Sequence, residues 1–165
     1  MQQLTPYEYV LIDIANGYGL DKLTWDERIT WVKYHEANPN DKFGPNIDNK
    51  SVLMVDFTFL NKELIDIIRQ KSKKLYIIDH HSQAKDVLKP TDNAIHDMQH
   101  SAAYLTWQFF YPNEKVPIFI KLIEDGDIKT QKYQYTGYFT TTLKYKYKMD
   151  PKEFENWSNL LKSEN

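Results

Sequence analysis

Ser51-Val-Leu-Met-Val-Asp56 and Leu75-Tyr-Ile-Ile-Asp79-His80-His81 are the two stretches that decide the fold. Each begins with a short apolar run rich in Val, Ile or Tyr, and each run ends in an aspartate, which is typical of a buried strand. The amphipathic stretch 61–71 lies between them and predicts a helix. We therefore predict an α/β fold, in which a mainly parallel sheet is flanked by helices.

Metal-capable side chains follow both predicted strands. Asp56 closes the first strand, and Asp79-His80-His81 closes the second. Because ligands of parallel sheets gather at the carboxyl ends of the strands, we expect these side chains to converge at one edge. Carboxylate oxygens together with imidazole nitrogens suit a divalent ion such as Mn²⁺, Mg²⁺, Fe²⁺ or Zn²⁺. The sequence thus predicts a divalent metal site at this edge.

The composition restricts the range of functions. A length of 165 residues suits one domain with a real core. The formal net charge of −2 argues against broad binding of nucleic acid, so short oligonucleotides are the only nucleic-acid ligands that we expect. The chain has no cysteine, which excludes disulfides and thiolate chemistry. With no apolar run of membrane length and no signal peptide, we expect a cytoplasmic protein that does not contact a membrane.

The Asp-His-His sequence after an apolar strand resembles the third motif of the DHH phosphoesterase superfamily. That superfamily includes RecJ-type nucleases, nanoRNases, exopolyphosphatases and family II pyrophosphatases. Three further stretches are similar to other motifs of the superfamily, in the same order: Met54-Val-Asp-Phe-Thr58, residues 97–110 and Leu122-Ile-Glu-Asp-Gly-Asp127. The resemblance implies metal-dependent hydrolysis of a phosphoester or phosphoanhydride bond, with Mn²⁺ or Mg²⁺ as cofactor.

The resemblance also implies metal ligands. Asp56 matches a carboxylate that bridges two metal ions, and His80 matches an imidazole ligand. Either Asp125 or Asp127 matches the last carboxylate ligand. Asp79 would orient His80 through the other ring nitrogen, as second-layer carboxylates commonly do.

Catalytic and substrate-binding roles follow in the same way. Asp79 and His81 are the implied catalytic residues, because His81 matches a residue that faces the substrate phosphate, where an imidazolium stabilises developing charge. His100 and Ser101 would contact the small phosphorylated substrate at the start of a helix. Ordinary surface and helix-capping roles are the alternative for these two residues.

The first 40 residues depart from the superfamily. Relatives begin with a strand that ends in a His and two Asp at short spacing, whereas residues 6–22 contain no His. Thr5-Pro-Tyr-Glu8 and Thr24-Trp-Asp-Glu27 are capping boxes, which open helices. We therefore predict a helical hairpin over residues 1–40 in place of the first motif. Asp13 and Asp21 are the candidates to replace the missing ligands.

Residues 12–38 have a resemblance of their own. They are similar to a segment of the phage-type single-subunit RNA polymerases that lies ahead of the catalytic palm motifs. The match carries no metal-binding aspartate of the polymerase, so no polymerase activity follows. It suggests a phage gene in which a polymerase fragment was joined to a DHH fragment.

The predicted organisation is a hairpin (1–40), a DHH-like α/β core (41–128) and a short C-terminal extension packed on the core (129–165). Within the extension, Lys144-Tyr-Lys-Tyr-Lys148 predicts a strand whose lysines are either solvated or in contact with a nucleic-acid backbone. The extension is shorter than the second domain of the superfamily. Apolar surface left uncovered in this way favours a homo-oligomer.

Two functions remain open at this point. One is a metal-dependent phosphoesterase or phosphoanhydride hydrolase of DHH type that acts on a small nucleotide or polyphosphate. The alternative is a catalytically inactive, DHH-derived phage protein that binds a host protein or a small ligand. Metal content separates the two.

Overall fold

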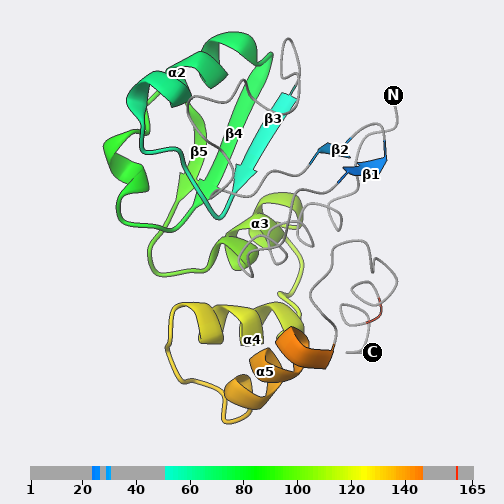
Figure 1. Cartoon of the computed structure of the whole chain (residues 1–165). Helices are drawn as coiled ribbons and strands as arrows, with labels where there is room; N and C mark the ends of the chain where they lie inside the picture. Colours follow the sequence, from blue (N-terminus) through cyan, green and yellow to red (C-terminus); the bar gives the residue numbers. More distant parts are fainter. Residues whose placement is uncertain (1–23, 27–28, 31–50, 147–158, 160–165) are drawn as a thin grey trace.

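The structure, a computed structural model, describes residues 24–26, 29–30, 51–146 and 159 (Figure 1). A parallel sheet with the strand order β3-β4-β5 forms its centre. The strands are β3 (Ser51–Val55), β4 (Lys74–Asp79) and β5 (Asn93–His96). The first two lie where the apolar runs predicted them, so the predicted α/β fold with a parallel sheet is confirmed.

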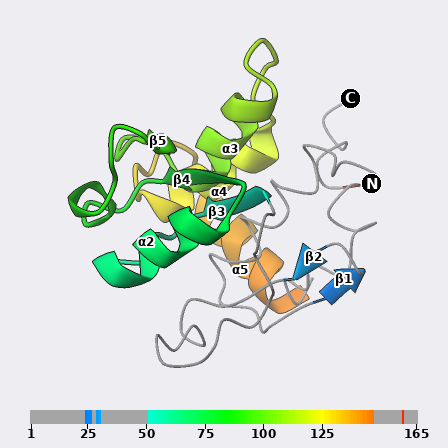
Figure 2. The same ribbon diagram turned by 90° about the horizontal axis from the view of Figure 1, so that it is seen from above.

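Helix α2 (Lys62–Lys71) connects β3 to β4 and covers one face of the sheet (Figure 1; Figure 2). It begins at Asn61, whose side chain accepts a hydrogen bond from the amide of Leu64 at 3.1 Å, and such a cap contributes about 1 kcal/mol. Its apolar residues recur at helical spacing and so form one buried face. That face packs into a core that contains Met54, Ile65, Ile68, Leu75 and Ile77.

The strand register brings the carboxyl ends of the three strands level with one another. Val55 pairs with Ile78, and Asp79 pairs with His96. The amide of Asp56 continues the ladder by donating to the carbonyl of Ile78 at 2.9 Å. As a result, the residues that follow β3 and β4 start from the same height at one edge of the sheet.

Three helices lie beyond this edge (Figure 1). They are α3 (Ala102–Phe110), α4 (Ile118–Asp127) and α5 (Thr136–Lys146). α4 and α5 pack closely, with the rings of Phe119 and Phe139 meeting edge to face at 5.4 Å between centroids. Gly126 permits this approach, because a Cβ at that position would lie 2.8 Å from Cγ2 of Thr140. The last residue of α4, Asp127, contacts His80 at the sheet edge.

An ion pair fastens α2 to the loop that precedes β5. The Nε and Nη2 atoms of Arg69 donate to the two carboxylate oxygens of Asp92 at 2.8 and 2.6 Å. Nη2 also donates to the carbonyl of Val87 at 2.8 Å. The Asp92 side chain is only 4% exposed, so the bidentate pair is largely buried. Because Asp92 directly precedes β5, the pair lies at the amino ends of the strands, away from the carboxyl edge.

The strand predicted over residues 144–148 is wrong for the described residues 144–146, which belong to the last turn of α5. α5 buries Thr136 and Leu143 on its inner side, at helical spacing. Lysine and tyrosine alternate at its end, but both Lys144 and Tyr145 are exposed, so the alternation does not separate two faces of a strand. Packing of the first two turns against α4 therefore decides the conformation.

The predicted N-terminal hairpin is described at only five residues. There, β1 (Thr24–Asp26) and β2 (Ile29–Thr30) form an antiparallel pair, so these residues do not form the helix that was predicted to begin at Thr24. Thr, Trp and Ile favour extended backbone, and this preference competes with the capping box. The remaining residues of the hairpin, including Asp13 and Asp21, lie outside the described residues.

Within the described part of the chain, no helix has the length and apolar character needed to span a bilayer.

Candidate functional site

Asp56 stands where β3 ends, in an unusual backbone conformation. Its φ is 62°, in the left-handed region that aspartate tolerates better than most residues. Since its amide is still bonded to β4, the left-handed turn changes the direction of the chain without releasing it from the sheet. The side chain of Asp56 is 18% exposed and meets the end of β4.

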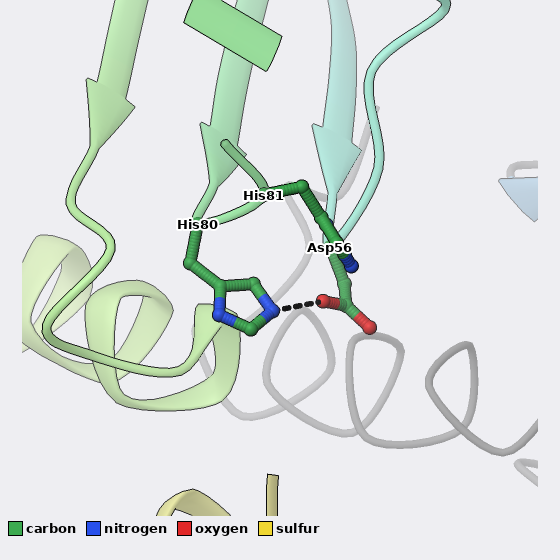
Figure 3. Close-up of side chains that lie close together, drawn as sticks. All are labelled: Asp56, His80 and His81. Carbon is green, nitrogen blue, oxygen red and sulfur yellow. Dashed lines mark ion pairs between the residues drawn. The ribbon is translucent and has the colours of Figure 1, made fainter. Parts of the chain in front are cut away.

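The imidazole of His80 faces the carboxylate of Asp56 (Figure 3), and the carboxylate of Asp127 lies near the same ring nitrogen. Its Nε2 atom is 3.3 Å from Oδ1 of Asp56 and 3.4 Å from Oδ2 of Asp127, the last residue of α4. Both Nε2 of His80 and Oδ1 of Asp56 are buried, and neither makes a hydrogen bond within the described part of the chain. Buried polar atoms of this kind normally have a partner, because leaving them without one costs free energy.

The charges of this cluster shift the pKa values of its members. The Asp56 carboxylate raises the pKa of His80, burial opposes that rise, and the charge of Asp127 adds to it. Burial raises the pKa of Asp127, the charge of His80 opposes this, and repulsion by Asp56 adds to it. Two carboxylates thus share one imidazole, which leaves an excess of negative charge that a cation would neutralise.

The spacing of these atoms fits a divalent metal ion. Nitrogen and oxygen ligands lie about 2.1 Å from an ion such as Zn²⁺, so neighbouring ligands of a tetrahedral site stand about 3.4 Å apart. The two contacts of His80 Nε2 have this length. A ring nitrogen of His81 also lies within 4.8 Å of the ligand atoms of Asp56 and His80. Asp56, His80 and His81 are therefore the residues whose ligand atoms lie close enough to share an ion, while Asp127, with a side chain 42% exposed, contacts His80 from the side that is open to solution.

Asp79 does not orient His80, contrary to the prediction. Its Oδ1 atom accepts from the amide of His81 at 3.0 Å and contacts Nδ1 of the same residue at 2.8 Å. The chain turns sharply after β4, and an aspartate commonly binds the amide two residues ahead in such a turn. Asp79 is fully buried, whereas the His81 side chain is 56% exposed. The buried carboxylate therefore holds the exposed imidazole.

Of the two candidate carboxylates on α4, Asp127 faces His80 and Asp125 does not. Asp125 is 3% exposed and accepts four hydrogen bonds, three from the loop between α4 and α5 and one from the first residue of α5. The donors are the hydroxyls of Thr130 and Thr136 and the amides of Lys132, at 2.7 Å, and Tyr133, at 3.2 Å. Burial raises the pKa of Asp125, but these bonds lower it more, so the net pKa lies far below its usual range.

The same loop contains two residues with left-handed backbone, Lys129 with φ of 57° and Gln131 with φ of 54°. Alternation of this kind turns successive amides toward one point and forms a concave anion site. Here the anion is the carboxylate of Asp125 itself. Asp125 thus organises the start of α5, which is a structural role.

His100 and Ser101, the predicted substrate-binding residues, lie at the start of α3. Ser101 caps the helix: its hydroxyl oxygen accepts from the amide of Tyr104 at 3.2 Å, and the residue is 1% exposed. Nδ1 of His100 lies 2.7 Å from Oε1 of Glu124 on α4, and its ring stacks on Tyr104 at 4.1 Å between centroids. The cap alone accounts for Ser101, and contact of His100 with substrate stays a prediction.

Two residues of this region were missed by sequence reasoning. Thr58 is buried and donates to Oδ2 of Asp79 at 2.5 Å. Glu124, the partner of His100, lies one helical turn before Asp127 on α4. The spacing of Glu124 from Asp127 places the two on one helix face and is a signal that the sequence contains. Thr58 lies in the stretch 54–58 that is similar to a superfamily motif, but nothing in the sequence indicates that its hydroxyl binds Asp79.

One relative, an uncharacterized protein of Acanthamoeba polyphaga mimivirus, is 31% identical to the chain over 153 residues. The match covers 89% of this chain and 34% of the relative, so the chain spans about a third of that protein's length. No protein-family model matches the chain, and no solved structure matches it.

Proposed function

We propose that the chain is a metal-dependent hydrolase of phosphoester or phosphoanhydride bonds, of DHH type, that acts on a small nucleotide or polyphosphate. One observation carries the proposal. Two buried ligand atoms, Oδ1 of Asp56 and Nε2 of His80, face each other at 3.3 Å and make no hydrogen bond among the described residues. They come from the carboxyl ends of adjacent parallel strands, where α/β proteins bind their ligands.

The residues of the site divide the work between them. Asp56 and His80 would hold the ion, and Asp127, which contacts His80, would be the third ligand that the resemblance implies. A bound divalent ion polarises phosphoryl oxygens and lowers the pKa of its water ligand. His81, anchored by Asp79 and exposed beside the ion site, would contact a phosphate oxygen.

The substrate class follows from the charges. A divalent ion next to an imidazole favours an anionic group such as a phosphate. The chain as a whole carries a formal charge of −2, so long polynucleotides gain little from it electrostatically. A short substrate with a terminal phosphate, pyrophosphate or a bridging phosphodiester fits both conditions.

A catalytically inactive derivative that binds a host protein or a small ligand is the second candidate. The observation in its favour is that residues 6–22 lack the His of the first DHH motif. Asp56 and His80, with Asp127 or His81 as a third ligand, would suffice for one ion, whereas the superfamily uses two. A protein with one remaining ion site would retain ligand binding more readily than turnover.

Metal analysis joined to a turnover screen tests both candidates. The protein would be equilibrated with Mn²⁺, its metal content measured, and hydrolysis followed with pyrophosphate, short oligoribonucleotides, adenosine bisphosphate and cyclic dinucleotides. The proposal requires bound metal and turnover in the wild type, both lost in His80→Ala and Asp127→Asn. Asp86→Asn, an exposed aspartate in the short helix η2 (Ala84–Asp86), is the matched control. Metal binding without turnover would favour the second candidate, and absence of metal binding would overturn the proposed site.

A further inference from the structure

The loop after β3 contains a threonine that is bonded to the end of β4. Thr58 is 5% exposed, and its hydroxyl donates to Oδ2 of Asp79 at 2.5 Å. Asp79 has no exposed surface. A buried carboxylate needs donors on both oxygens, because an oxygen without a donor carries the full cost of desolvation. Thr58 supplies the donor for the oxygen that faces away from His81.

The other oxygen of Asp79 holds His81 by both its main chain and its ring. Oδ1 accepts from the His81 amide at 3.0 Å and lies 2.8 Å from Nδ1. The carbonyl of His81 in turn accepts from Nε2 of His96 at 2.8 Å. Although the ring is 56% exposed, its backbone and one ring nitrogen are therefore fixed. A solvated surface histidine does not need such anchoring.

The donors on Asp79 determine which ring nitrogen of His81 carries hydrogen. Both oxygens of Asp79 act as acceptors, Oδ2 from the Thr58 hydroxyl and Oδ1 from the His81 amide, so Nδ1 is the donor in its contact with Oδ1. Nε2 is then the ring atom left for a ligand, as an acceptor in the neutral ring or as a donor in the imidazolium. The tautomer of an exposed residue is thus set by two buried ones.

We propose that Thr58 is a positioning residue that, through Asp79, fixes His81 in the Nδ1–H tautomer and directs Nε2 toward the phosphate of the substrate. The phosphate contact rests on the proposed function. The tautomer itself does not, since it depends only on bonds within the chain. Without the Thr58 hydroxyl, Asp79 would turn to share its remaining donors between both oxygens, and the His81 ring would sample both tautomers.

Nuclear magnetic resonance of ¹⁵N-labelled histidine tests the first half directly. The ring nitrogens of His81 should report a single Nδ1–H tautomer in the wild type, a mixture in Thr58→Val and a single tautomer again in Thr58→Ser. Thr106→Val is the matched control, because Thr106 is a fully buried threonine whose hydroxyl has no hydrogen-bond partner among the described residues. It should leave His81 unchanged. A mixture or the Nε2–H tautomer in the wild type would overturn the proposal, even where Thr58→Val does not fold.

Kinetics and metal binding test the proposed contact between Nε2 of His81 and the substrate phosphate. Thr58→Val should lower kcat about tenfold or more, in the range found when a residue that orients an active-site imidazole is removed. Mn²⁺ affinity should change little, since the Thr58 hydroxyl is bonded to Asp79, which is not among the proposed ligands. Recovery of kcat in Thr58→Ser would support the positioning role, and unchanged kcat in Thr58→Val would overturn it. Wild-type protein that shows the fixed tautomer but binds no metal would refute the proposed function and leave the role of Thr58 in fixing His81 intact.

Discussion

The imidazole rings of His80 and His81 lie 4.5 Å apart between centroids, yet each is held by a different carboxylate. His80 faces Asp56, which follows another strand, whereas His81 is bonded to Asp79 on its own strand. One ring is therefore placed among the buried ligand atoms, and the other is anchored at the surface. We therefore expect His80 and His81 to have different roles, which single substitutions of each histidine can distinguish.

Binding of Mn²⁺ should raise the melting temperature of the wild-type protein. A ligand that binds only the native state at 100 times its Kd adds about 2.7 kcal/mol to the free energy of unfolding. Asp56→Ala and His80→Ala should each abolish the rise, because each removes one of the two ligand atoms that face each other at 3.3 Å, while Asp86→Asn should preserve it. If thermal denaturation of the wild type is unaffected by millimolar Mn²⁺, Mg²⁺, Co²⁺ and Zn²⁺, the cluster is not a metal site.

Substitution by asparagine should affect stability at Asp125 and metal binding at Asp127. Asp125→Asn removes the charge that four donors share, and we expect it to lower the free energy of unfolding by about 2 kcal/mol or more. Asp127→Asn should cost little stability but abolish metal binding. Urea denaturation and metal titration of both variants would check this. Equal metal affinity in Asp127→Asn and the wild type would exclude Asp127 as a ligand.

The pair formed by Arg69 and Asp92 should make stability depend on pH in the acid range. Burial raises the pKa of Asp92, but the bonds from Arg69 and the Lys89 amide lower it more, so the net shift is downward. A lowered pKa in the folded state adds stability above the unfolded pKa of about 3.9 and loses it as the pH falls below that value.

Asp92→Asn tests this pH dependence. At neutral pH it should lower the free energy of unfolding by roughly 1–3 kcal/mol, as expected for hydrogen bonds to a charged group. The difference from the wild type should narrow as the pH falls below about 4. Denaturation curves across this range would reveal it, and a constant difference would contradict it. Metal binding should be unaffected, since the pair lies away from the carboxyl edge.

Self-association should depend on the outer face of α5. Tyr138 and Tyr145, two turns apart on this helix, are 77% and 75% exposed, and Tyr135 just before it is 66% exposed. Aromatic surface of this kind favours association. Tyr138→Glu combined with Tyr145→Glu should shift the particle toward the monomer in light scattering, and Lys73→Glu, an exposed change elsewhere, should not. A monomeric wild type at tens of micromolar would show that this face is not an interface between copies.

The sheet and its functional edge could be predicted because both depend on short-range patterns. The apolar runs before Asp56 and Asp79 have the length and composition of buried strands, and parallel strands place their ends together. The pairing of His81 with Asp79 could not be predicted. It depends on the turn after β4 and on a donor, Thr58, that is 21 positions away from Asp79 in sequence.

Packing between elements and loops explains the other differences. Asp125 and Asp127 look alike in sequence, and only the loop that closes over Asp125 separates their roles. Helix α5 forms because Leu143 is buried, although its last residues alternate as a strand would. Membership of the DHH superfamily stays a prediction from the order of motifs.

The left-handed backbone of Asp56 also restricts which residues can replace it in evolution. Aspartate, asparagine and glycine accept that conformation readily, whereas most other side chains are strained by it. A relative that has lost catalytic activity would still need one of these three residues, because the turn requires the left-handed conformation. An aspartate at position 56 is therefore weak evidence for catalytic activity. Asparagine or glycine at this position in a relative would indicate that the site has lost its activity. Position 80 has no such backbone restriction, so a histidine at this position in a relative is stronger evidence for a functional site than an aspartate at position 56.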